Sequence, residues 1–230
     1  MIILAIECSA KAASAAVLRD GELLCEIYNE NGKTHSETLM PAVETALKKS
    51  GVAPKDINLF AVSEGPGSFT GIRIGLAAVK GMAFPDKKIV PISTLSVIAR
   101  AFADKYTGGQ YTVCAVMDAR CGQFYNAVFS VKDGVITRLC DDRAVPGEQI
   151  AAQLKDNNNV YVAGDGAAVF CEKFGFANSG CAQRAGAVAR LAFENADKAV
   201  DQGTVFGKYL RRPSAERERL AKQEGEKKAR

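Results

Sequence analysis

The pattern of apolar and polar positions opens the chain with a buried strand and a hairpin. Residues 2–6 form a continuous apolar run, and a later run leads into Asp20-Gly21, a two-residue hairpin signal. The same order returns in the second half, where Asp133-Gly134 is the turn and Gly134 lies 113 residues after Gly21. The expected strands are 2–6, 15–18 and 22–28, and then 112–117, 123–131 and 135–139. Two copies of one three-stranded antiparallel element are therefore expected.

Helical and strand-like segments follow each three-stranded element. They are expected at 36–50, 59–63, 70–84, 88–91 and 95–103 in the first half, and at 147–155, 160–163, 167–174 and 183–202 in the second. This order predicts an α/β fold of two duplicated mixed β/α subdomains, the architecture shared by actin, sugar kinases and heat-shock ATPases. The expected parts are a first subdomain at 1–104, a second at 105–210 whose last helix can pack back on the first, and a charged, flexible tail at 211–230.

Composition narrows the kinds of protein that fit this pattern. The 230 residues are 47% hydrophobic, enough for real cores, and no apolar run reaches the roughly 18 residues that a membrane span needs. Seven cysteines without a C-x-x-C pair indicate free thiols and a cytoplasmic protein. The single histidine, His35, excludes a site that needs a His pair within this chain. We interpret His35 as a capping or surface residue.

The net charge of +4 is concentrated at the end of the chain. Residues 211–230 hold eight Lys or Arg and four Glu, which leaves 22 charges of each sign in the rest. Nucleic-acid binding by a folded domain calls for a basic face. The neutral body does not favour it, and the tail stays a candidate for ordering on a partner or on RNA.

In this architecture, ATP is held by turns after the first strand of each half. Such a turn needs an acidic residue followed closely by glycine, so that backbone N–H groups can approach the phosphates. Here the turns read Glu7-Cys8-Ser9-Ala10-Lys11 and Asp118-Ala119-Arg120-Cys121-Gly122. Both acids are present, but the glycines are replaced. Strand-ending polar residues are the simpler interpretation of Glu7 and Asp118, and Gly164-Asp165-Gly166, at the place for adenosine, fits a plain strand-to-helix turn equally well.

A glycine-rich loop at residues 64–71 also requires a test as a phosphate site, because it follows a strand and opens a helix. Six positions rather than five separate Gly65 from Gly71, and Ile72-Arg73 stands where a P-loop has Lys-Ser/Thr. The loop also lacks the third glycine of the dinucleotide motif, where Thr70 stands. Its spacing therefore excludes both motifs.

The helix after this loop is apolar on nearly every side, with Arg73 and Lys80 as its only charges. A helix of this kind is buried on more than one side, and small residues at 71, 75 and 78 allow another backbone to come close. The preceding helix, which starts with the capping-box pattern Thr34-x-x-Glu37, has only a narrow apolar stripe. The side of the helix that the sheet does not bury is therefore covered either by that preceding helix or by another chain.

Taken together, these motifs resemble the TsaB family of bacterial proteins for tRNA threonylcarbamoyladenosine formation. The resemblance runs from end to end. It rests on Ile3-Leu4-Ala5-Ile6-Glu7-Cys8-Ser9, His35-Ser36-Glu37 with Leu39 and Pro41, the specific block from Gly65 to Gly75, Asp118-Ala119-Arg120, Gly164-Asp165-Gly166 and Tyr209-Leu210-Arg211. Many members have Asp where this chain has Glu7.

The resemblance implies a non-catalytic subunit that binds and activates TsaD, the metal-bearing transferase. It implies pairing through first-domain helices, a homodimer when alone, the ATPase TsaE as a further partner, and tRNA contact through the complex. The implied interface is Leu39, Val43, Leu47, Gly71, Ile72, Arg73, Gly75, Leu76, Val79, Lys80 and Met82. The implied vestigial nucleotide positions are Glu7, Ser9, Asp118, Arg120, Gly164, Asp165 and Gly166, with no cofactor or metal in the isolated chain and a nucleotide only at a complex interface. The alternatives are an ATP-binding enzyme of the same fold and an inactive peptidase-like homologue.

Overall fold

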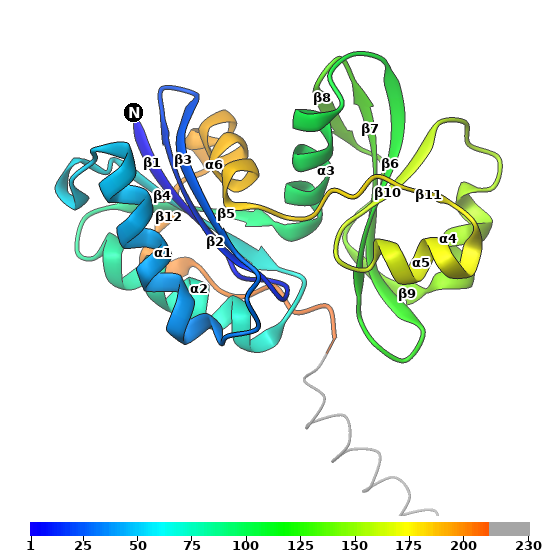
Figure 1. The fold of residues 1–230 in the computed structure, drawn as a ribbon, viewed down its shortest axis with the longest axis horizontal. Helices are drawn as coiled ribbons and strands as arrows, with labels where there is room; N and C mark the ends of the chain where they lie inside the picture. The colour runs from blue at the N-terminus through cyan, green and yellow to red at the C-terminus, as the bar shows by residue number, and fades with distance from the viewer. Residues whose placement is uncertain (212–230) are drawn as a thin grey trace, which may run out of the picture.

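The computed structural model describes residues 1–211, which form two halves side by side, each built around its own sheet (Figure 1). The first sheet contains β1 (Ile2–Glu7), β2 (Ala13–Arg19), β3 (Glu22–Asn29), β4 (Leu59–Gly65), β5 (Lys88–Ser93) and β12 (Val200–Asp201). The second contains β6 (Gln110–Asp118), β7 (Gln123–Lys132), β8 (Val135–Arg138), β9 (Arg143–Pro146), β10 (Val160–Ala163) and β11 (Ala177–Asn178).

Helices cover both faces of each sheet. They are α1 (His35–Ser50), α2 (Phe69–Ala83), α3 (Thr94–Lys105), α4 (Gly147–Leu154), α5 (Ala167–Phe174) and α6 (Ala185–Glu194), with short 3-10 turns η1 (Pro54–Asp56), η2 (Ala196–Lys198) and η3 (Gln202–Thr204). Helices α1 and α2 pack on one face of the first sheet and α6 on the other. The second sheet packs on α3 on one side and on α4 and α5 on the other. Helices α3 and α6 meet between the halves (Figure 1).

Strand pairing confirms the duplicated three-stranded element. The first sheet has the order β12-β5-β4-β1-β2-β3, and the second runs β11-β10-β6-β7-β8 with β9 beside β7. In each half the first strand pairs antiparallel with the second and parallel with a later strand. Asp20-Gly21 and Asp133-Gly134 turn the two hairpins with positive φ at both residues, the conformation for which Asp-Gly is preferred. The fold is therefore the expected actin-like architecture.

Local sequence signals explain the first helices. Thr34 and Glu37 form the expected capping box at the start of α1, and Gly51 ends the helix with φ 64°. Ser68 caps α2 by accepting the N–H of Gly71 at 3.2 Å. No helix in residues 1–211 is both long and apolar enough to cross a membrane.

The helix expected at 183–202 is wrong in its extent, because α6 ends at Glu194. The chain then turns through η2, and β12 pairs antiparallel with β5 at the edge of the first sheet. The backbone pairing that this edge offers outweighs the local helical pattern.

Helix α6 belongs by its packing to the first sheet. Its N-terminal N–H groups are satisfied by that sheet, since Ala185 donates to the Ser14 hydroxyl at 3.0 Å and Gly186 to the Glu26 carboxylate at 2.8 Å. Val205 then enters the core under α1 and α2. Part of the range expected as the second subdomain, 105–210, therefore packs on the first sheet.

Candidate functional site

The first turn of the expected nucleotide site follows β1, and its acidic residue points into the protein. Glu7 is only 1% exposed. Its carboxylate accepts hydrogen bonds from the Ser9 backbone N–H at 2.6 Å and from the hydroxyls of Ser9 and Ser63. Burial raises the pKa of Glu7, and the hydrogen bonds from Ser63 and Ser9 act against this rise. The Ser9 N–H, which a phosphate cradle would offer to an anion, is used within the chain.

The glycine-rich loop between β4 and α2 packs directly on this turn. The backbone N–H of Ser68 donates to the Ser9 carbonyl at 2.7 Å. A side chain at Gly67 would overlap the same carbonyl, and one at Gly71 would overlap that of Cys8. His35 Nε2 lies 2.8 Å from the Ala10 carbonyl oxygen. The glycines therefore allow close backbone packing against the first turn, which agrees with the exclusion of a P-loop.

The second turn, after β6, is also occupied by contacts of the chain itself. Asp118 accepts the Arg120 backbone N–H at 2.7 Å. Arg120 and Cys121 both have positive φ, an unfavourable conformation for these residues. The Arg211 guanidinium donates to the carbonyl of Ala119 and, at 3.1 Å, to that of Arg120. This arginine therefore holds the turn from outside.

The third turn, Gly164-Asp165-Gly166, lies against the end of β6. A side chain at Gly166 would come within 2.8 Å of the Asp118 nitrogen, and one at Gly164 would overlap the Val116 carbonyl. Asp165 reaches the space between the halves. Asp165 is exposed by its surface area, but protein atoms around its carboxyl group partly desolvate it; this desolvation, followed by the charges of Glu7 and Asp118, raises the pKa of Asp165 to about 6. The structure thus brings Asp118 and Asp165 together, close to the buried Glu7.

A cavity of about 800 Å³ lies between the halves, next to these turns. Its wall includes Ser9, Asp118, Arg120 and Asp165 from the expected nucleotide positions, but not Glu7. Within residues 1–211, no three His, Cys, Asp or Glu side chains are grouped as a metal site requires. In the turns around the cavity, the backbone N–H groups of Ser9, Ser68 and Arg120 donate to partners within the chain.

Helices α1 and α2 form the second candidate site, a face on the outer side of the first half. Most of the residues expected at a partner interface are instead buried in the core of this chain: Leu39, Val43, Gly71, Ile72, Gly75, Leu76 and Val79. Leu47, Lys80 and Met82 are half-buried, and Arg73 is exposed. Apolar positions all round a helix do not distinguish the side facing the sheet from the side facing solvent.

The outward side of α2 carries mostly small or apolar residues, with Arg73 as its exposed charge. Thr70, Arg73, Ala77 and Gly81 are exposed, and Ile74, Ala78 and Met82 are partly exposed. On α1, Met40 is 47% exposed. We define the α1/α2 face as these outward residues of the two helices. Its small side chains leave room for the backbone of another helix to approach closely.

Sequence reasoning missed the role of residues 205–211, which we call the strap. It runs from the core of the first half, along α2, to the second turn of the cleft. Lys208 donates its N–H to the Glu64 carbonyl at 2.7 Å, and the Tyr209 ring lies 4.6 Å from the Phe69 ring. Arg211, expected in a flexible tail, is bound to the turn at Ala119, while the rest of that tail, 212–230, lies outside the described residues. The Tyr209-Leu210-Arg211 motif was the available signal.

Comparisons with known proteins agree with this geometry. The family model "TsaD: tRNA N6-adenosine threonylcarbamoyltransferase" matches residues 24–217. The tRNA threonylcarbamoyladenosine biosynthesis protein TsaB of Bacillus subtilis is 33% identical over 159 residues, which cover 69% of this chain and 68% of that protein. The chain belongs to the TsaB family.

A further relative and a solved structure agree with this family assignment. The TsaB protein of Haemophilus influenzae is 28% identical over 186 residues, covering 75% of each chain. The solved structure of YeaZ from Pseudomonas aeruginosa superposes with a TM-score of 0.78 and 25% identity, covering 91% of this chain and 99% of that one. The family is one of tRNA threonylcarbamoyladenosine biosynthesis proteins, and the match to the TsaD model shows that it is related to the TsaD transferases.

Proposed function

We propose that this chain is a non-catalytic subunit of the tRNA threonylcarbamoyladenosine machinery that binds and activates a TsaD-type transferase. The observation that carries the proposal is the contact of the Ser68 N–H with the Ser9 carbonyl, which fills the first phosphate turn with the chain's own backbone. The acid of that turn, Glu7, is buried against two serines. A carboxylate in this position does not orient a bound metal or water beside a phosphate.

The α1/α2 face is the surface proposed to meet the transferase. Ala77 and Gly81 lie one turn apart on its exposed side, and Ile74 and Ala78 border them. A partner helix that packs here buries small apolar surface without leaving a buried charge unpaired, which favours stable association. Arg73 stands at the border, held 3.8 Å above the Phe69 ring, where it can form a polar rim.

The family resemblance supplies the wider setting of this proposal. Alone, the chain pairs with a second copy through the same face. In the cytoplasm, the TsaE ATPase joins the pair with TsaD, and tRNA is contacted by the complex rather than by this chain alone. A nucleotide binds only at a junction between subunits, and the isolated chain needs no cofactor.

The test is a charged substitution on the exposed side of α2. Gly75 and Leu76, which are among the implied interface residues, are buried, and a charge there would disturb the core. Ala77→Glu instead places a charge on the face itself. We expect it to weaken binding to the cognate TsaD roughly thirtyfold or more, measured by titration calorimetry. Ala168→Glu on α5 is the matched control, since Ala168 is also helical and exposed. Equal affinity of a folded Ala77→Glu variant and the control would refute the assigned face.

A further inference from the structure

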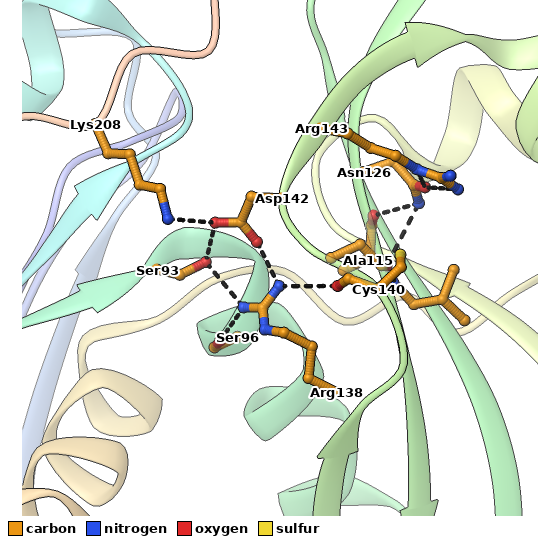
Figure 2. A network of polar contacts seen from close by, with 11 residues as sticks. Ser93, Ser96, Ala115, Asn126, Arg138, Cys140, Asp142, Arg143 and Lys208 are labelled. Atoms are coloured by element: carbon orange, nitrogen blue, oxygen red, sulfur yellow. Dashed lines mark hydrogen bonds and ion pairs between the residues drawn. The ribbon is translucent and has the colours of Figure 1, made fainter.

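A buried carboxylate joins the two halves of the molecule at a point away from the cleft turns. The Asp142 side chain, between β8 and β9, is 2% exposed. It accepts the Ser93 hydroxyl at 2.7 Å and pairs with Arg138 at 2.5 Å (Figure 2). Ser93 ends β5 of the first sheet, whereas Asp142 and Arg138 belong to the second half. The carboxylate therefore forms a direct bond across the junction.

Arg138 strengthens the same junction. Its guanidinium donates to the Ser96 hydroxyl at 2.6 Å and to the Cys140 carbonyl at 3.3 Å, and it lies 4.7 Å from the centre of the Phe129 ring. A buried charge with several partners is costly to leave unpaired, so this arrangement favours one relative position of the halves. Removing one partner of such a pair leaves the other charge uncompensated, which is strongly destabilising.

The strap is the third segment at this point. The Lys208 ammonium lies 3.7 Å from Asp142 (Figure 2). The backbone N–H of Lys208 donates to the carbonyl of Glu64, at the end of β4. On either side of Lys208, the strap touches α2. Phe206 lies under the Lys80 ammonium at 4.7 Å, and Tyr209 packs on Phe69 at the start of the helix.

These contacts form a continuous path from the junction to α2, where Phe69 lies 3.8 Å from the Arg73 guanidinium of the α1/α2 face. Asp142 and Arg138 form the polar contact between the halves, Lys208 of the strap pairs with Asp142, and the aromatic residues of the strap contact α2. We propose that Asp142 is a latch that fixes the strap against α2 and so regulates the affinity of the α1/α2 face for its partner. The regulatory part of this inference rests on the proposed function. The latch itself does not.

Hydrogen exchange of the full chain tests the latch without any partner. Asp142→Asn keeps the size of the side chain and removes its charge, and Lys208→Met removes the ammonium that faces Asp142, at a half-exposed position. Both are expected to speed exchange of the Lys208 amide about tenfold or more, while amides of β1 and β6 remain protected. Asp141→Asn, at the exposed neighbouring acid, and Lys208→Arg are expected to exchange as the wild type does.

Binding to the cognate TsaD then tests the regulation. We expect Asp142→Asn and Lys208→Met to weaken pairing roughly fivefold to tenfold, and Lys208→Arg to bind with the affinity of the wild type.

Unchanged protection of the strap in folded Asp142→Asn and Lys208→Met would overturn the latch. If Asp142→Asn does not fold, Lys208→Met decides alone. A loosened strap with unchanged affinity would overturn the regulation. Failure of the wild type to pair would refute the proposed function, while the exchange result would still decide the latch.

Discussion

The backbone N–H of Ser68 lies 2.7 Å from the carbonyl oxygen of Ser9, and this contact closes the turn after the first strand. The loop that begins α2 therefore packs into the place where an actin-like enzyme would hold phosphate. Two glycines permit that approach, because their hydrogen atoms face carbonyl oxygens of the turn. The glycines of the loop at 64–71 are thus explained by its close packing on the first turn, and that turn itself contains no glycine.

Close packing at Gly71 predicts a large effect of a single methyl group. Gly71→Ala would push a side chain into the Cys8 carbonyl, and we expect it to lower the free energy of unfolding by about 2–3 kcal/mol. Gly81→Ala, in the same helix, meets no atom within 4 Å and should raise stability by about 0.5–1 kcal/mol. Urea unfolding of both variants gives the comparison. Equal effects of the two substitutions would contradict the packing account.

The buried Glu7 predicts a pH dependence with a defined sign. Because burial raises its pKa in the folded state above 4.5, its stabilising contribution is complete below 4.5 and is lost as pH rises through the folded pKa. Glu7→Gln keeps an oxygen to accept the Ser9 N–H and removes the titration. The variant should therefore gain stability relative to the wild type as pH rises from 4 to 8, measured by urea unfolding at several pH values.

Glu37→Gln is the control with the opposite sign. Hydrogen bonds from Thr34 lower the pKa of Glu37, so its contribution is present above 4.5 and is lost as pH falls. This variant should lose stability relative to the wild type at neutral pH and approach it in acid. The same pH trend in both variants would contradict the assigned environments.

Desolvation and the nearby charges of Glu7 and Asp118 predict a shifted titration of Asp165. Carboxyl carbon chemical shifts should report its pKa at about 6. Asp118→Asn removes one of the two neighbouring charges and should lower the pKa of Asp165. The pKa should stay above the ordinary value of 3.8, because desolvation is the largest cause of the shift. An Asp165 pKa that is unaffected by Asp118→Asn would show that the two carboxylates do not interact.

The occupied turns predict that the isolated chain does not take up nucleotide. Titration of the full chain with Mg-ATP should give only heats of dilution. Stoichiometric binding that Asp118→Ala abolishes would instead favour the enzyme reading of the fold.

Local signals in the sequence were sufficient for much of the architecture. The Asp-Gly hairpins, the capping box at Thr34 and the repeated order of strands each depend on a few neighbouring residues, and all of them are present. The predicted end of the last helix, residue 202, was wrong because β12 forms there by pairing with β5, a strand more than 100 residues earlier. Long-range pairing of this kind leaves little trace in the local pattern.

The candidate sites were harder to derive for the same reason. The residues of the altered turns could be located from their order in the sequence, yet the burial of Glu7 depends on Ser63, which lies on another strand. The orientation of α2 could not follow from a helix that is apolar on nearly every side. The strap's contacts with Asp142 and Ala119 join segments that are far apart in sequence, so only the fold reveals them.

The most direct test of the central claim is the mass in solution of the full chain mixed with its cognate TsaD. We predict a stable one-to-one pair by light scattering, formed by the wild type and by Ala168→Glu and lost with Ala77→Glu. Two separate species in the wild-type mixture, at concentrations of tens of micromolar, would contradict the account.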